Sequence, residues 1–121
     1  MKNILLVEDE VLIGLDLKMK LLSKGYNVCG QVDTGEEAIQ QALQINPDLI
    51  ICDIRLKGEL SGIEAIKSLR EQGFLGKVIF LSGYGDKKIR EEASKVEPTA
   101  YLVKPVKYED LFTEVKQALN L

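Results

Sequence analysis

The sequence of 121 residues contains no histidine and no tryptophan, and only two cysteines. Without histidine, the chain can carry neither a histidine-based nucleophilic triad, nor a zinc–histidine site, nor a phosphohistidine. Cys29 and Cys52 stand apart in apolar surroundings and lack CxxC spacing, which predicts reduced core thiols. Any chemistry must therefore come from carboxylates, lysines, hydroxyls or a hard metal ion.

Long apolar runs and an excess of positive charge are also missing. The longest apolar stretches, Ile4–Val7 and Leu49–Cys52, are too short to cross a bilayer. No charged-then-apolar leader opens the chain, so we expect a cytoplasmic protein that does not bind membranes. Sixteen basic and 19 acidic residues give a net charge of −3. Because non-specific nucleic-acid binding needs clustered Lys and Arg, we expect no direct nucleic-acid binding by this chain.

Strand-like and helix-like segments alternate along the sequence. Apolar runs predict five strands, at Asn3–Val7, Tyr26–Val32, Leu49–Cys52, Val78–Leu81 and Ala100–Val103. The second run is the weakest and fits a sheet edge. Apolar residues at helical spacing predict a helix after each strand, the first of them from Leu12, Leu15, Met19 and Leu22. Capping boxes at Thr34–Glu37 and Ser61–Glu64, and a cap at Asp86, mark the beginnings of the next three helices.

This alternation predicts an α/β fold with a single domain over residues 1–121. We expect a doubly wound, five-stranded parallel sheet in the order 2-1-3-4-5, as a flavodoxin-like three-layer sandwich.

Reactive side chains follow four of the predicted strands. Glu8-Asp9-Glu10 follow the first strand, Asp53 the third, Ser82 the fourth and Lys104-Pro105 the fifth. Each alone is an ordinary loop residue, cap or surface charge. In an open parallel sheet, however, ligands bind beyond the carboxyl ends of the strands, where the strand order reverses. The four positions together therefore predict one site.

At these residues the chain resembles a response-regulator receiver domain of two-component signal transduction, similar to single-domain chemotaxis regulators, over essentially its whole length. The resemblance is carried by Ile4–Glu10, Asp48–Asp53, Val78–Gly83 and Tyr101–Pro105. It implies that Asp53 accepts a phosphoryl group from a sensor histidine kinase or a histidine phosphotransfer protein. It also implies a Mg²⁺ ion, for which Mn²⁺ can substitute, held by Glu8, Asp9, Asp53 and the backbone carbonyl of Arg55.

The resemblance further implies that Ser82 and Lys104 stabilise the phosphoryl oxygens and that a cis peptide at Pro105 orients Lys104. Ser82 and Tyr101 would form a switch that changes the surface around the fourth helix, fifth strand and fifth helix. A downstream protein or output domain would bind there, with the chain a monomer or a phosphorylation-dependent dimer. Such a protein is a signalling switch, not an enzyme that turns over an external substrate.

Elementary chemistry agrees with these roles. Crowded carboxylates repel one another, and a hard divalent cation with oxygen ligands relieves that repulsion. Phosphoryl transfer needs an in-line nucleophile and neutralisation of the equatorial oxygens.

The sequence departs from the family in the loop that follows Asp53. Leu56-Lys57 stand where receivers commonly carry Met-Pro, and the stretch to Gly62 is one residue longer than usual. A small aspartyl-phosphate phosphatase is an alternative, but such enzymes typically place a second Asp where this chain has Arg55. A flavin- or nucleotide-binding module would want a Gly- or Ser/Thr-rich phosphate loop after the first strand. A receiver fold that takes no phosphate is disfavoured by the complete set of site residues.

Overall fold

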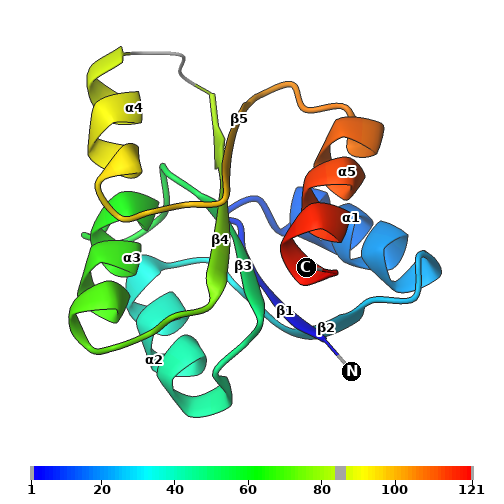
Figure 1. Ribbon diagram of the computed structural model, residues 1–121, viewed down its shortest axis with the longest axis horizontal. Coiled ribbons are helices and arrows are strands. Elements are labelled where there is room, and N and C mark those ends of the chain that lie inside the picture. The colour runs from blue at the N-terminus through cyan, green and yellow to red at the C-terminus, as the bar shows by residue number, and fades with distance from the viewer. Residues whose placement is uncertain (1, 84–86, 121) are drawn as a thin grey trace.

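A computed structural model describes residues 2–83 and 87–120 of the chain. Strands and helices alternate strictly (Figure 1). The strands are β1 (Asn3–Val7), β2 (Asn27–Val32), β3 (Leu49–Asp53), β4 (Lys77–Ser82) and β5 (Ala100–Val103). The helices are α1 (Val11–Ser23), α2 (Gly35–Ile45), α3 (Gly62–Glu71), α4 (Lys87–Ser94) and α5 (Tyr108–Leu119). The cap predicted at Asp86 lies outside the described residues. Within the described part, no helix has the length and apolar character needed to span a bilayer.

The sheet is parallel throughout and has the predicted order β2-β1-β3-β4-β5. Val7 of β1 pairs with Cys52 of β3, and Ser82 of β4 pairs with Val103 of β5. The strands thus end nearly in line, and the residues that follow them share one edge of the sheet. The strand order reverses between β1 and β3, which is where this fold class binds ligands.

Helices cover both faces of the sheet. In Figure 1, α1 and α5 lie on one face and α2, α3 and α4 on the other. Each face has its own apolar core, because neighbouring residues of a buried strand point to opposite sides. Leu5 and Val7 of β1 belong to the core on the α2–α4 side, and Ile4 and Leu6 to the core on the α1–α5 side. The apolar runs used to predict the strands are therefore buried on both faces.

Helix α1 buries a different row of residues from the apolar row used to predict it. Leu12 is 80% exposed and Met19 is 69% exposed, whereas Gly14, Leu17 and Leu21 are buried. Gly14 lies close to β2, since a methyl group there would meet the end of the Gln31 side chain.

The two predicted capping boxes differ. At α3 both bonds form: the Ser61 hydroxyl accepts from the N–H of Glu64, and the Glu64 carboxylate accepts from the N–H of Ser61. At α2 the Thr34 hydroxyl accepts from the N–H of Glu37, but it also donates to the Glu37 carboxylate. This carboxylate is therefore turned toward the hydroxyl, and the second bond of the predicted box is missing.

Arg70, near the end of α3, fastens the α4–β5 connection to the rest of the domain. Its guanidinium donates hydrogen bonds to the carbonyls of Val96 at 3.0 Å and Glu97 at 3.3 Å. It also donates to the carbonyls of Phe74 at 3.0 Å and Gly76 at 2.8 Å, before β4. A single planar side chain thereby satisfies acceptors from two separate loops.

We expect Arg70→Lys to lower the free energy of unfolding by about 2 kcal/mol, because an ammonium lacks the fork that reaches these carbonyls together. Urea denaturation followed by circular dichroism measures the change. The control Lys67→Arg, on the exposed side of the same helix, should change the free energy by less than about 0.5 kcal/mol. Equal stability of the two variants would contradict the role given to Arg70.

Candidate functional site

The buried polar side chains of the described residues gather at the carboxyl edge of the sheet. Asp53, the last residue of β3, is 3% exposed; Glu8, which follows β1, is 4% exposed; Ser82, the last residue of β4, is 2% exposed. Burying a charge is costly unless it is paired or binds a metal. Two buried acids at the strand-order reversal therefore mark a functional site.

Lys104, directly after β5, faces both of these acids. Its Nζ lies 2.9 Å from Oδ1 and 3.0 Å from Oδ2 of Asp53, and 3.6 Å from Oε2 of Glu8. Its backbone N–H donates to the carbonyl of Ser82 at 2.7 Å, which fixes where the side chain starts. The peptide bond between Lys104 and Pro105 is cis.

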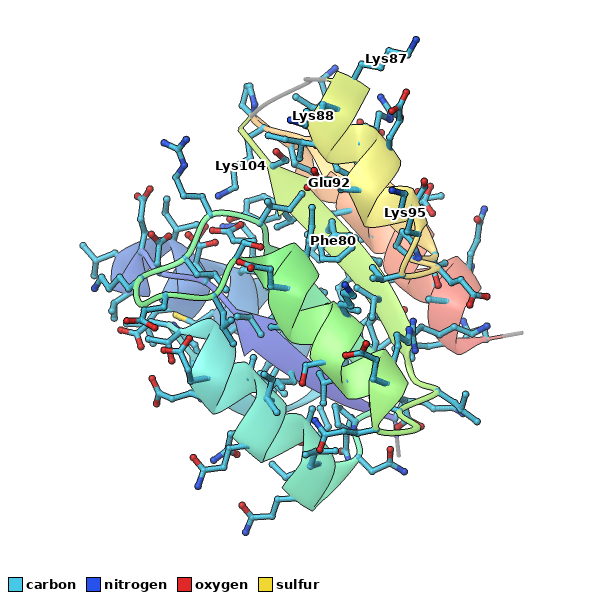
Figure 2. The ribbon with its side chains drawn as sticks, turned by 90° about the vertical axis from the view of Figure 1, so that its left-hand side faces the viewer. Phe80, Lys87, Lys88, Glu92, Lys95 and Lys104 are labelled. Atoms are coloured by element: carbon cyan, nitrogen blue, oxygen red, sulfur yellow. The ribbon has the colours of Figure 1, made fainter. Side chains whose placement is uncertain are left out.

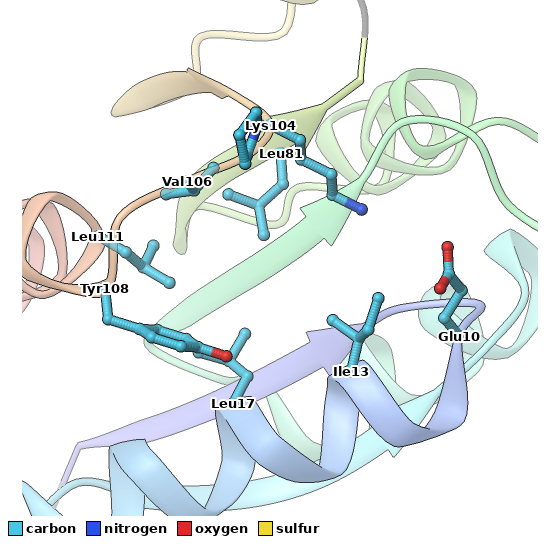
Figure 3. Close-up of a pocket in the computed structure, with 9 residues that line it drawn as sticks. Glu10, Ile13, Leu17, Leu81, Lys104, Val106, Tyr108 and Leu111 are labelled. Atoms are coloured by element: carbon cyan, nitrogen blue, oxygen red, sulfur yellow. The ribbon is translucent and has the colours of Figure 1, made fainter.

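Beside these acids lies a cavity of about 450 Å³ between α1 and α5, lined by Lys104, Glu10 and apolar side chains that include Leu17 and Leu111. Figure 3 shows the Lys104 ammonium and the Glu10 carboxylate facing each other at one end of it. The aliphatic part of Lys104 thus rests against apolar side chains while its charged end reaches the acids.

The site carries more negative than positive charge. Burial, and to a lesser degree the neighbouring Glu8, raise the pKa of Asp53 to about 8, although Lys104 acts in the opposite direction. For Lys104, burial is the largest influence and lowers the pKa, but the hydrogen bond and charge of Asp53, with Glu8 and Glu10, raise it above its ordinary value. One ammonium is therefore shared among several acids, and the site attracts a further cation.

The donor atoms fit a hard divalent cation. Glu8, Asp9 and Glu10 each offer a carboxylate oxygen, and these oxygens lie within 4.8 Å of one another. Only Oδ2 of Asp53 has hydrogen-bond geometry toward Lys104, so the buried Oδ1 has no hydrogen-bond partner among the described residues. A buried oxygen without a hydrogen bond, next to a group of carboxylates, suits Mg²⁺, which prefers carboxylate oxygens. Arg55 lies in the loop that follows Asp53, and its side chain is exposed.

The two residues predicted to form the switch lie on neighbouring strands. Tyr101 of β5 pairs with Phe80 of β4, is half-buried, and packs against the core on the α2–α4 side. Ser82 follows Phe80 by two residues and therefore points to the same face of the sheet. The structure thus brings Ser82 and Tyr101 to one side of the sheet edge.

Sequence reasoning missed one contact of Tyr101. Charged residues of α4 such as Lys87, Lys88 and Glu92 are exposed (Figure 2). The Arg90 guanidinium, however, lies over the Tyr101 ring, 5.1 Å from its centroid. A cation and an aromatic face at this distance attract each other. No local signal in the sequence pairs these residues, which belong to different elements.

Comparison with known proteins gives consistent results. The family model described as the response regulator receiver domain matches residues 4–116. Chemotaxis protein CheY of Thermotoga maritima is 31% identical over 119 residues, which cover 98% of this chain and 95% of CheY. Transcriptional regulatory protein PdtaR of Mycobacterium tuberculosis is 30% identical over 119 residues, which cover 98% of this chain but 57% of PdtaR. The chain thus spans little more than half the length of that relative.

Solved structures have the same fold. The signal receiver domain of a modulated diguanylate cyclase from Desulfovibrio desulfuricans G20 has a TM-score of 0.88 at 35% identity, with 99% of this chain and 94% of that one covered. Response regulator protein TrrA from Thermotoga maritima, in complex with Mg(2+)-BeF, has a TM-score of 0.86 at 34% identity, with 98% and 100% covered. Because the family model matches nearly the whole chain and the topology agrees, this chain belongs to the response regulator receiver domains of two-component signalling.

Proposed function

We propose that this chain is a phosphoacceptor switch in which Asp53 receives a phosphoryl group from a phosphohistidine of a sensor histidine kinase or histidine phosphotransfer protein. The observation that carries the proposal is the Asp53 carboxylate, buried at the strand-order reversal and facing Lys104 and Glu8. Receiver domains are signalling switches, not enzymes that turn over an external substrate. The same residues explain how phosphorylation of such a switch takes place.

The nucleophile ends β3, its charge partner Glu8 follows the neighbouring β1, and Lys104 follows β5, which is separated from β3 by β4. An Asp53 carboxylate oxygen forms the new bond to phosphorus while the donor's bond to phosphorus breaks, and the donor leaves with the electron pair. Lys104, already within 3.0 Å of the Asp53 carboxylate, is placed to pair with the phosphoryl oxygens. Ser82, at the end of the neighbouring strand, supplies a neutral hydroxyl donor.

Glu8, Asp9 and Asp53, with the backbone carbonyl of Arg55, are the proposed ligands of Mg²⁺. Mn²⁺ can substitute because it shares the preference for oxygen ligands. When bound, the cation supplies additional neutralisation of phosphoryl charge. The solved complex of TrrA with Mg(2+)-BeF supports this assignment by relationship.

Phosphorylation is proposed to reach the surface through β4 and β5. A hydrogen bond from Ser82 to a phosphoryl oxygen draws the end of β4 toward the site. Tyr101 packs on the same face beside Phe80, so its side chain adjusts to the new position. The surface of α4, β5 and α5 then changes, and a downstream protein or output domain binds there. We propose that this takes place in the cytoplasm, with the chain a monomer or a phosphorylation-dependent dimer and without direct nucleic-acid binding.

Acetyl phosphate tests the proposal directly. With Mg²⁺, intact-mass spectrometry of the wild type should show the addition of one phosphoryl group, and chelation of the metal should prevent it. Asp53→Asn should show no addition, because the nucleophile is lost. The matched control is Asp48→Asn, just before the same strand at its opposite end, where the carboxylate accepts from the N–H of Asn3.

The control should be labelled like the wild type. Labelling of Asp53→Asn would refute Asp53 as the acceptor. Labelling that is indifferent to the metal would refute the role given to Glu8 and Asp9.

A further inference from the structure

The loop between β3 and α3 (residues 54–61) is attached to the start of α2. Lys57 of this loop forms an isolated parallel bridge with Thr34, and the Lys57 Nζ lies 3.7 Å from Oδ2 of Asp33. In the sheet, β1 separates β2 from β3. Residues that follow β2 and β3 can therefore contact each other only beyond the carboxyl ends of the strands, where β1 no longer separates them. The contact joins the two loops that flank the strand end carrying Glu8 and Asp9.

Glu36, in the first turn of α2, contacts the same loop at two points. Its Oε1 accepts a hydrogen bond from the N–H of Leu60 at 3.3 Å. Its Oε2 lies so near Gly58, which has φ of +87°, that a methyl group there would be 2.8 Å from it. At the adjacent Gly35, a methyl group would lie 2.8 Å from Cβ of Leu60. Because Gly35 and Gly58 lack side chains, the start of α2 can approach the loop closely, and the Glu36 carboxylate contacts both Gly58 and Leu60 of the loop.

The loop is also closed at its base. The N–H of Gly62 donates to the carbonyl of Ile54 at 2.7 Å, so the loop leaves and rejoins the framework next to Asp53. Arg55 lies between this base and the part of the loop attached to α2. The position of its backbone therefore depends on both attachments.

We propose that Glu36 is a positioning residue that holds the β3–α3 loop so that the backbone carbonyl of Arg55 is preorganised for Mg²⁺. This inference rests on the proposed function, which makes that carbonyl a metal ligand. Groups that orient metal ligands strengthen metal binding without touching the metal, because the ligands lose less freedom when the ion binds. Sequence reasoning did not single out Glu36, since a glutamate in the first turn of a helix is ordinary.

Metal affinity of matched variants tests the role of Glu36. In Mg²⁺ titrations followed by NMR chemical shifts, Glu36→Ala should raise the dissociation constant about fivefold. Glu36→Gln should stay within about twofold of the wild type, because its amide oxygen can still accept from Leu60. The control Glu59→Ala removes a carboxylate from the same loop that has no hydrogen bond or ion pair with any residue the structure describes. It should also stay within about twofold, since exposed charges interact weakly.

Amide hydrogen exchange in the absence of metal gives an independent readout. In Glu36→Ala, the Leu60 amide should exchange about fivefold faster at unchanged global stability, because its acceptor is lost. Unchanged Mg²⁺ affinity in Glu36→Ala overturns the positioning role, as does an equal loss in Glu59→Ala, which would assign the effect to charge. A wild type that binds no Mg²⁺ refutes the metal site of the proposed function instead, and the positioning role falls with it.

Discussion

Gly62→Ala is expected to lower the free energy of unfolding by about 3 kcal/mol, through overpacking beside Asp53. Gly62 begins α3 where the chain returns to the end of β3. A methyl group at this position would overlap the backbone carbonyl oxygen of Asp53 and lie 2.9 Å from Sγ of the buried Cys52. Because the obstructing oxygen is backbone in the middle of the sheet, it cannot rotate away as a flexible side chain does. The first turn of α3 and the end of β3 must separate.

Urea denaturation measures this effect against a matched control. Gly83→Ala also adds one methyl group near the site, but no atom of the described residues beyond its chain neighbours lies within 4 Å of that methyl group, and φ is not positive. We expect a change smaller than about 0.5 kcal/mol there. If Gly62→Ala were as stable as Gly83→Ala, the close approach of α3 to β3 would be wrong.

Asp53→Asn is expected to stabilise the metal-free protein by about 2 kcal/mol at pH 8, since it removes a buried charge that the fold disfavours. The pKa of Asp53 is raised from an ordinary 3.8 to about 8, first by burial and then by Glu8. The expected gain in the free energy of unfolding is smaller than the full pKa shift of Asp53 implies, because Lys104 loses its charged partner in the variant. If Asp53 acts as proposed, function and stability thus oppose each other at this position.

The raised pKa also determines how this difference depends on pH. Between the unfolded value near 4 and the folded value of about 8, the folded chain holds a proton on Asp53 that the unfolded chain has lost. The free energy of unfolding of the wild type therefore falls as the pH rises through this window. The advantage of Asp53→Asn should be small near pH 4 and should grow up to about pH 8.

Thermal denaturation in a chelator at several pH values measures this trend. Glu59→Gln, which neutralises an exposed carboxylate, should show a constant offset from the wild type. Saturating Mg²⁺ should reduce the advantage of Asp53→Asn, because the wild type alone then gains binding energy from the full set of ligands. An advantage that shrinks as the pH rises would contradict the raised pKa.

Much of the fold was predictable because its signals are local. Apolar runs such as Ile4–Val7 predict buried parallel strands, since each residue there contacts a core on one face or the other. The Ser61–Glu64 capping box depends on residues three apart and formed as predicted. The same local reasoning was incomplete at α1, where two apolar stripes compete and only packing against the sheet selects one.

The sequence by itself determined which residues share the carboxyl edge of the sheet, because parallel strands end together there and Glu8, Asp53 and Lys104 each lie at or directly after the end of a strand. Tertiary structure alone decided how these groups behave. The raised pKa of Asp53 depends on its burial. The hydrogen bond between Glu36 and Leu60 of the β3–α3 loop joins residues 24 positions apart. The Arg90 guanidinium of α4 lies over the Tyr101 ring of β5. Such contacts arise from packing between distant segments, and no periodicity or spacing within one segment encodes them.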